Sequence, residues 1–201
     1  MGEAYYRVLC DVEIPGRWFI DDPRLSDGTR QYPWIFTRGQ PVSLQGVVAL
    51  PLAQSGTALD YTEATFGMPV LSQKAAGIVR DLAPREVQLI PACVESQRDP
   101  FFIMNVLSVR RCVDERRSAF KKFATNDPVR PDLAGKYDII TKLVLDVTDI
   151  GDSQVFRVKD SEHDLIISKT IKDGLEGMRA TGLRYWPVLP EGVDIQDFFG
   201  S

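Results

Sequence analysis

The sequence predicts an α+β fold, a mostly antiparallel sheet with short helices, and three observations lead to this prediction. First, the pattern of residues 71–91 recurs at residues 167–187, at a constant offset of 96 residues. Second, each copy joins an apolar run to an amphipathic segment and then to an alternating strand. This gives two similar strand–helix–strand units at about 69–92 and 165–188. Third, the other apolar runs have the length of strands and are separated by turn residues, as in antiparallel folds.

The N-terminal part is expected to be irregular and rich in short strands. Residues 5–14 alternate and contain aromatic and branched side chains, which predicts a strand. A Pro-Gly pair then forms a turn, and a short second run follows at 18–20. Prolines and glycines divide residues 32–52 into short strands and turns.

The first unit begins with an extended run that ends at Ser72. The hydroxyl of Ser72 is expected to cap a helix over residues 73–82, which ends before a proline at position 84. A strand over 86–94 follows. The apolar run 101–109 comes after a turn and is expected to pair with that strand as an antiparallel hairpin.

The segment between the two units carries weaker signals. Residues 118–123 are expected to form a helical turn, and residues 126–135, which contain two prolines, look like a connection. Two strands are expected at 138–150 and 154–158, on either side of a Gly-Asp pair.

The second unit repeats the first. Ser168 is expected to cap a helix over residues 169–179, Gly182 supplies a turn, and residues 183–189 form a strand. At first sight Ser72 and Ser168 resemble matched active-site serines, but a pair of matched helix caps explains them better.

We expect a single domain over residues 1–201. The runs between the two units need neighbouring strands, and the proline-rich connection is too short to separate independent domains. Loosely, an irregular β-rich part covers residues 1–60, and the repeat-containing part covers residues 61–201.

The composition is that of an ordinary globular protein, with 44% hydrophobic and 26% charged residues. No run approaches the roughly 18 apolar residues of a membrane span, and the first residues lack the pattern of a secretory signal. We therefore expect a cytoplasmic protein without a membrane partner. The three cysteines are far apart in strand-like runs, which favours reduced core thiols over disulfides or a metal site.

The net charge of −4 is unevenly distributed along the chain. Residues 110–136 carry eight basic and four acidic side chains, whereas residues 137–201 carry seven and twelve. The basic segment 110–122 could contact phosphates, but acidic residues interrupt it and no aromatic residue is spaced for base stacking. A solvated helix face is the better interpretation, and the role of this segment stays open. An acidic protein suits a basic protein partner rather than nucleic acid.

Residues with catalytic chemistry are scarce. The one histidine, His163, is expected in a polar turn between two acids, which argues against a zinc site or a serine nucleophile with a histidine base. The acidic pairs Asp21–Asp22 and Glu162–Asp164 are expected in loops, where their pKa values would stay near normal. Phosphate-binding glycine loops are missing, and the three tryptophans are expected in the core. We therefore expect no enzyme activity, no metal and no cofactor.

A series of short motifs runs in a fixed order along the two units and the segment between them. Its residues are Gly67, Pro69, Ser72, Val87 to Pro91, Asn105, Val106, Val113, Asp114, Ser118, Phe156, Arg157, Ser168, Thr181, Gly182 and Trp186 to Val188. In this order and spacing the chain resembles the immunity proteins of bacterial polymorphic toxin systems, specifically the eleventh-numbered immunity family, formerly a domain of unknown function. The resemblance covers about residues 60–190, and it depends on order and spacing because each motif is mostly an apolar pattern.

The resemblance implies a non-enzymatic inhibitor that binds the catalytic domain of a cognate toxin. Nuclease toxins are frequent neighbours of this family, so a basic nuclease is the expected partner. For the binding surface we expect acidic residues with two apolar anchors near the C-terminus, namely Asp160, Glu162, Asp164, Glu191, Asp194, Asp197, Phe198 and Phe199. A solvated turn and a frayed tail would explain the same residues.

Two other functions remain open from the sequence. The chain could be a small-molecule or regulatory binding module that uses a cleft between the two units. It could also be an enzyme of unfamiliar type that uses the paired carboxylates.

Overall fold

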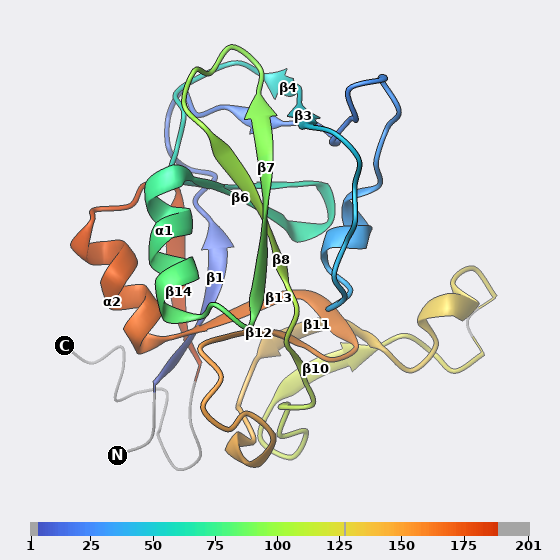
Figure 1. The fold of residues 1–201 in the computed structure, drawn as a ribbon. Helices are drawn as coiled ribbons and strands as arrows, with labels where there is room; N and C mark the ends of the chain where they lie inside the picture. The colour runs from blue at the N-terminus through green and yellow to red at the C-terminus, as the bar shows by residue number, and fades with distance from the viewer. Residues whose placement is uncertain (1–3, 127, 189–201) are drawn as a thin grey trace.

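The computed structural model describes residues 4–126 and 128–188, and within them the strands form two five-stranded sheets and two two-stranded pairs (Figure 1). The first sheet has the order β3-β7-β8-β6-β5 and the second has the order β14-β1-β13-β12-β9. The strands of the first sheet are β3 (Val48–Leu50), β5 (Tyr61–Ala64), β6 (Met68–Ser72), β7 (Val87–Val94) and β8 (Phe101–Val106). Those of the second sheet are β1 (Tyr5–Cys10), β9 (Val109–Arg110), β12 (Val155–Val158), β13 (Ser161–Ser168) and β14 (Leu183–Val188).

Most strand neighbours in both sheets are antiparallel, and two parallel pairs lie at sheet edges, β3 with β7 and β9 with β12. With two α-helices among the described residues, this is the expected α+β fold. None of the helices in the described part is long and apolar enough to cross a membrane.

Both α-helices follow a strand and begin after a serine. Helix α1 (Gln73–Leu82) begins after Ser72, whose hydroxyl accepts a hydrogen bond from the backbone N–H of Ala75. Helix α2 (Lys169–Gly177) begins after Ser168, whose hydroxyl accepts from the N–H of Ile171. The structure thus gives both serines the geometry of an N-cap.

The two helices lie side by side on one side of the molecule (Figure 1). Gly174 of α2 permits this approach, because a Cβ on it would lie 2.8 Å from the Cγ2 atom of Ile78 on α1.

The two units correspond in strand register as well as in sequence pattern. In the first unit, Val87 pairs with Val106 and Ala92 pairs with Phe101. At the same offset of 96 residues, Leu183 pairs with Cys10 and Val188 pairs with Tyr5. Strand β1, from the N-terminus, therefore occupies in the second sheet the place that β8 occupies in the first.

This placement of β1 brings the first and last strands of the described residues into one sheet. Strand β1 lies between β13 and β14 and is antiparallel to both. On this pairing we propose that residues 1–201 fold as one domain, because the N-terminal strand has its neighbours in the C-terminal unit.

The hydrophobic core has three parts among the described residues. The central part brings both α-helices together with both sheets, through side chains such as Val8, Leu71, Val79, Val155 and Ile171. A second part lies between the first sheet and the N-terminal segment, where Trp18 and Phe36 are fully buried. A third part lies between the second sheet and the segment 137–150.

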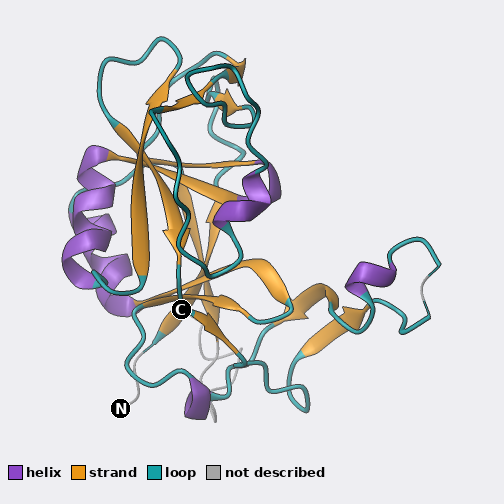
Figure 2. Ribbon diagram, turned by 45° about the vertical axis from the view of Figure 1, so that its right-hand side comes forward, coloured by secondary structure: helices purple, strands orange, loops and turns teal. Residues whose placement is uncertain are grey.

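The remaining short elements lie around the two sheets. They are β2 (Phe19–Ile20), which pairs with β4 (Leu52–Gln54), β10 (Ala119–Lys122), which pairs with β11 (Tyr137–Lys142), and the 3-10 turns η1 (Pro33–Phe36), η2 (Thr65–Gly67), η3 (Pro131–Leu133) and η4 (Val147–Asp149). The β10–β11 hairpin and its loop extend away from the two sheets in both views (Figure 2).

Several local predictions are wrong. The strand expected over 5–14 ends at Cys10, and the run 101–109 is divided between β8 and β9, which belong to different sheets. Residues 118–123 do not form a helical turn, because 119–122 form β10, which pairs with β11. The predicted strand 138–150 ends at Lys142, and η4 occupies part of the rest. His163 lies within β13 and not in a turn, since Ser161–Ser168 form one continuous strand.

Candidate functional site

The predicted acidic surface is only partly present in the described residues. Five of its residues lie outside them, namely Glu191, Asp194, Asp197, Phe198 and Phe199. Asp164 is buried and forms an ion pair with Arg7 over 3.1 Å, and the hydroxyl of Ser161 donates to its Oδ2 at 2.7 Å. Asp164 is therefore engaged inside the protein, and we do not include it in a binding surface.

Asp160 lies in the partly exposed turn that joins β12 to β13, and Glu162 is the second residue of β13. Asp160 has a φ of 65°, a left-handed conformation that aspartate tolerates better than most residues. Lys159 lies 3.4 Å from the carboxylate of Asp160 and 3.7 Å from that of Glu162. Two acids thus share one base, and this turn carries a net negative charge.

Beside this turn lies a cluster of exposed aromatic rings that the sequence does not reveal. The rings of Tyr32 and Trp34 are stacked, with centroids 4.3 Å apart, and the ring of Phe66 meets Trp34 edge-on at 5.4 Å. Tyr32 is 52% exposed and Phe66 is 57% exposed. We call Tyr32, Trp34 and Phe66 the aromatic platform. Trp34 was expected in the core, and Trp186 as well, yet Trp34 is half-buried and Trp186 is exposed.

The platform is held in an unusual backbone conformation. Phe66 has φ 61° and ψ 28°, the left-handed region in which a bulky side chain is strained. Such a residue costs about 1–3 kcal/mol and persists only where the surroundings fix it. Here η2 packs against the start of β13. The two segments are close, since a Cβ built on Gly67 would lie 3.5 Å from the carbonyl oxygen of His163.

A fully buried arginine fixes both segments beneath the platform. The Nη2 atom of Arg157 donates to the carbonyl oxygen of Gly67 at 3.0 Å, and its Nη1 atom donates to that of Glu162 at 2.5 Å. Burial lowers the pKa of the Arg157 guanidinium from its usual value. The negative charges nearby oppose this effect, and they include Glu63.

Glu63 belongs to the same buried polar group. The hydroxyl of Tyr61 donates to its Oε1 atom at 2.5 Å. Burial raises the pKa of the Glu63 carboxyl above its ordinary value of 4.5, although the Tyr61 hydrogen bond and the Arg157 charge act in the opposite direction. A partly desolvated acid, a phenol and an arginine thus form a polar group next to Gly67, the residue that follows Phe66.

His163, whose side chain is 55% exposed, projects from β13 near this group. Its Nε2 atom lies 3.4 Å from the hydroxyl of Ser161 and 3.8 Å from the carboxylate of Asp164. Among the described residues, no group of three or more histidine, cysteine, aspartate or glutamate side chains is placed to hold a metal ion.

A cleft with a volume of about 820 Å³ lies between the two units. One wall is the segment that joins α1 to β7, with Arg85 and Glu86, and the other wall includes Arg110 and Gln154. The carboxylate of Glu86 accepts from the backbone N–H groups of Gln154 and Val155, at 2.8 and 3.1 Å, and so ties the first unit to the start of β12 at the cleft.

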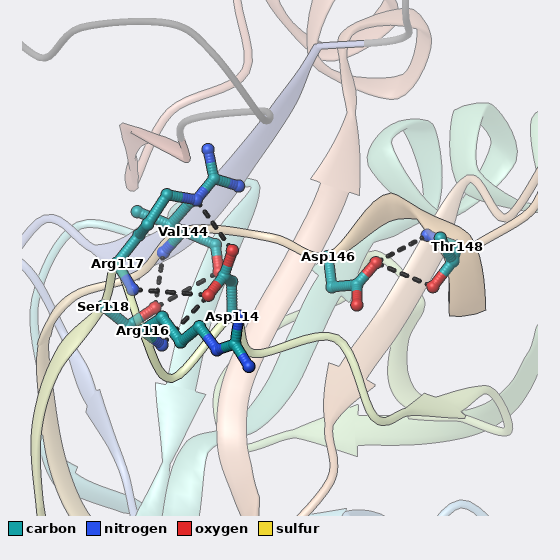
Figure 3. A network of polar contacts seen from close by, with 7 residues as sticks. All are labelled: Asp114, Arg116, Arg117, Ser118, Val144, Asp146 and Thr148. Carbon is teal, nitrogen blue, oxygen red and sulfur yellow. Dashed lines mark hydrogen bonds and ion pairs between the residues drawn. The ribbon is translucent and has the colours of Figure 1, made fainter.

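The basic segment 110–122 forms the base of the β10–β11 hairpin, and Figure 3 shows the contacts that fix part of it. The carboxylate of Asp114 accepts from the N–H groups of Arg116 and Arg117 at 3.0 and 3.3 Å, and from the Nε atom of Arg117 at 2.7 Å. The hydrogen bond from Arg117 lowers the pKa of Asp114. The hydroxyl of Ser118 donates to the carbonyl oxygen of Val144.

Two lysines of this segment are also in ion pairs. Lys121 lies 3.1 Å from the carboxylate of Asp138, and Lys122 lies 2.6 Å from that of Glu115. These pairs hold the basic side chains to the hairpin itself, which favours a structural role for them.

Several residues of the motif order described above have structural tasks. Asn105 is buried, and its amide donates to the carbonyl oxygen of Gln40 and to the side chain of Gln88. Gly182 has a φ of 92°, and a Cβ on it would lie 2.1 Å from the carbonyl oxygen of Tyr61. Asp114, Ser118 and Arg157 likewise form hydrogen bonds inside the protein. These motif residues therefore stabilise the fold.

Comparison with known proteins identifies the family. No curated protein matches the sequence. The sequence does match the immunity protein family (Imm11) over residues 14–189, which is most of its 201 residues. The chain therefore belongs to the Imm11 family of immunity proteins.

Proposed function

We propose that this protein binds and neutralises a cognate bacterial toxin of a polymorphic toxin system, and that it acts in the cytoplasm by protein–protein inhibition, without chemistry of its own. The observation that carries this proposal is the family match over residues 14–189. Inhibition by binding needs an exposed surface with rigid anchors, and the aromatic platform has this character.

We further propose that the toxin is a basic nuclease. The protein has a net charge of −4, and its two acids at the β12–β13 turn share a single lysine. Opposite charge on the partner accelerates association and disfavours wrong partners. A nuclease that binds nucleic acid carries such a positive surface.

The test is co-expression with the toxin encoded in the adjacent reading frame. Cells that make the toxin domain alone should lose viability and degrade nucleic acid, and cells that also make this protein should survive. In vitro, nuclease activity should fall linearly as the protein is added and reach zero near a molar ratio of one. A heat-unfolded sample of the protein is the control.

The absence of a toxin gene beside the coding sequence, or full nuclease activity at a molar excess of the protein, would contradict the proposal. An adjacent toxin that is inhibited but acts on a substrate other than nucleic acid would leave the neutralising function standing and contradict only the nuclease assignment.

A second candidate function is the binding of a small molecule in the cleft between the two units. The observation in its favour is the cleft of about 820 Å³, which two arginines, Arg85 and Arg110, line together with apolar residues. A ligand-dependent rise in melting temperature without any protein partner would support it. A screen of anionic metabolites that gives no rise would count against it.

A further inference from the structure

We infer that the aromatic platform is the anchor of the toxin interface, and that the bound toxin packs an apolar surface on Phe66 and Tyr32 and places basic side chains against Asp160 and Glu162. This inference rests on the proposed function, because it names the surface through which that function is carried out. Four features of the structure lead to it.

The first feature is that Tyr32 and Phe66 are exposed while the half-buried Trp34 holds both of them. Trp34 contacts both of the other rings, at 4.3 and 5.4 Å, so none of the three is an isolated surface side chain. Aromatic residues that are ordered before binding lose little conformational entropy in a complex. Tyrosine and tryptophan are also the residues most enriched among interface hot spots.

The second feature is the strain at Phe66. Its left-handed conformation would suit glycine or asparagine, and the residue stays 57% exposed in the free protein. The fold nevertheless places a phenylalanine there, and the fully buried Arg157 holds the next residue, Gly67, through its carbonyl oxygen. A strained residue fixed in this way is typical of a site whose role lies outside the stability of the fold.

The third feature is the position of the acidic turn relative to the platform. Arg157 donates to the carbonyl oxygens of both Gly67 and Glu162, so one guanidinium fixes the turn after Phe66 and the start of β13. Asp160 and Glu162 therefore lie at the edge of the same surface. Lys159 is close to both carboxylates, and Arg38 and Arg111 line the hollow beside Glu162. An apolar centre with a charged edge is the usual arrangement of a protein interface.

The fourth feature is the sign of that charge, which decides between occupants. A second copy of this chain would carry the same net charge of −4, so self-association would bring like charges together, which is unfavourable. A basic partner has the complementary charge. The toxin domain is accordingly the occupant that fits the platform.

The experiment measures the affinity of full-length variants for the catalytically inactive toxin domain from the adjacent reading frame. Phe66→Asn removes the ring and keeps a residue that tolerates the left-handed conformation. Tyr32→Ala removes the other exposed ring. Each should weaken binding at least about tenfold, mainly through faster dissociation. The melting temperature of Phe66→Asn should not fall, so its loss of affinity cannot come from unfolding.

Trp186→Ala is the matched control. Trp186 is 53% exposed, much like Tyr32 and Phe66, but it lies on β14, an edge strand of the second sheet that is separated from β12 by β1 and β13. Its affinity should equal that of the wild type. Glu162→Gln tests the charged edge and should slow association at low ionic strength but not at high ionic strength. It leaves the Glu162 carbonyl, and hence the Arg157 contact, in place.

The outcomes separate this inference from the proposed function. If the wild-type protein does not bind the toxin domain, the proposed function fails and the inference fails with it. If the wild type binds but Phe66→Asn and Tyr32→Ala bind equally well, the function stands and the platform assignment is wrong. A change of oligomeric state in these variants with unchanged toxin affinity would assign the platform to self-association and would also overturn the inference.

Discussion

Arg157 and Gly67 are 90 residues apart in the chain and are joined by a hydrogen bond of 3.0 Å, which the guanidinium of Arg157 donates to the Gly67 carbonyl oxygen. Arg157 lies on β12 of the second sheet, and Gly67 ends the turn before β6 of the first sheet. The contact thus ties the two sheets together next to Phe66 of the aromatic platform.

The first prediction concerns this arginine. Arg157→Met should lower the free energy of unfolding by about 3 kcal/mol, because two buried carbonyl oxygens lose their donor and nearby Glu63 loses a compensating charge. Denaturant unfolding measures the change. Arg111→Met, at an exposed position, should change stability by less than about 0.5 kcal/mol. Equal effects of the two substitutions would contradict this account of Arg157.

The second prediction compares two glycines with similar backbone conformations. Gly182 has φ 92° and Gly135 has φ 76°, so both are strained by a side chain. A Cβ on Gly182 would lie 2.1 Å from the Tyr61 carbonyl oxygen, whereas a Cβ on Gly135 would meet nothing within 4 Å. Gly135→Ala should therefore cost about 1 kcal/mol, from conformation alone.

Gly182→Ala should cost about 3 kcal/mol or more, because a backbone clash is added to the same conformational strain. Thermal unfolding of both variants checks the difference. If the two variants melt at the same temperature, the close approach of Gly182 to Tyr61 does not contribute to stability, and this part of the account is wrong.

The third prediction concerns the pH dependence of stability. Burial raises the pKa of Glu63 in the folded protein, so the folded state keeps a proton that the unfolded chain has already released. The contribution of Glu63 to the free energy of unfolding therefore falls as the pH rises from about 4.5 towards the raised pKa. At pH values above the raised pKa this contribution stays low. Glu63→Gln removes this titration and keeps an oxygen that can accept from Tyr61. The variant should be more stable than the wild type at pH 7, and the advantage should vanish near pH 4.

Glu115 provides a control of opposite sign. Hydrogen bonds from Lys122 and Tyr137 lower the pKa of its carboxyl, so its contribution is present above the ordinary value of 4.5 and is lost as the pH falls. Glu115→Gln should be less stable than the wild type at pH 7. Unfolding curves between pH 4 and pH 8 test both variants, and parallel pH profiles for Glu63→Gln and the wild type would refute the prediction.

Local elements of the fold could be predicted because their signals are local. Ser72 and Ser168 each precede an amphipathic stretch, and a cap with helical periodicity is sufficient to place a helix start. Helix α1 matches the predicted range 73–82, and α2 ends two residues before the predicted end. The β7–β8 hairpin was also expected, because its two strands are neighbours in sequence.

Elements that depend on distant partners could not be predicted. Residues 119–122 become a strand only because β11 lies beside them, and His163 lies in a strand because β1 and β12 flank β13. The place of β1 in the second sheet is also non-local, since its partners lie more than 150 residues away. Periodicity carries no information about such pairing.

The candidate site was missed for a related reason. Tyr32 and Trp34 lie in a segment broken by turns, and Phe66 follows a strand, so no spacing in the sequence links them. Their contact depends on η1 meeting η2 in the folded chain. The one usable signal was the pair Phe66–Gly67, an aromatic residue next to a glycine between two strands, which is typical of a tight turn with an exposed side chain.

The last prediction uses the correspondence of the two units. Tyr5 and Val188 are cross-strand partners, so the first and last strands of the described residues are antiparallel neighbours whose ends meet. If Val188 is joined to Tyr5 through a short linker and the chain is opened between Thr125 and Asn126, which are exposed, β1 follows β14 as β8 follows β7. We expect this circular permutant to fold, because every ladder of the second sheet is kept and the β14–β1 pairing becomes local in sequence.

Deletion of residues 1–10 is the contrasting variant, because it removes the strand between β13 and β14 and breaks two ladders at once. It should abolish cooperative unfolding, since the central core loses Val8 and both neighbouring strands are left with unpaired backbone groups. The permutant should instead unfold cooperatively, with a free energy within about 2 kcal/mol of the wild-type value. A permutant as unstable as the deletion would show that the order of strands along the chain, and not only their pairing, is needed for the second unit to form.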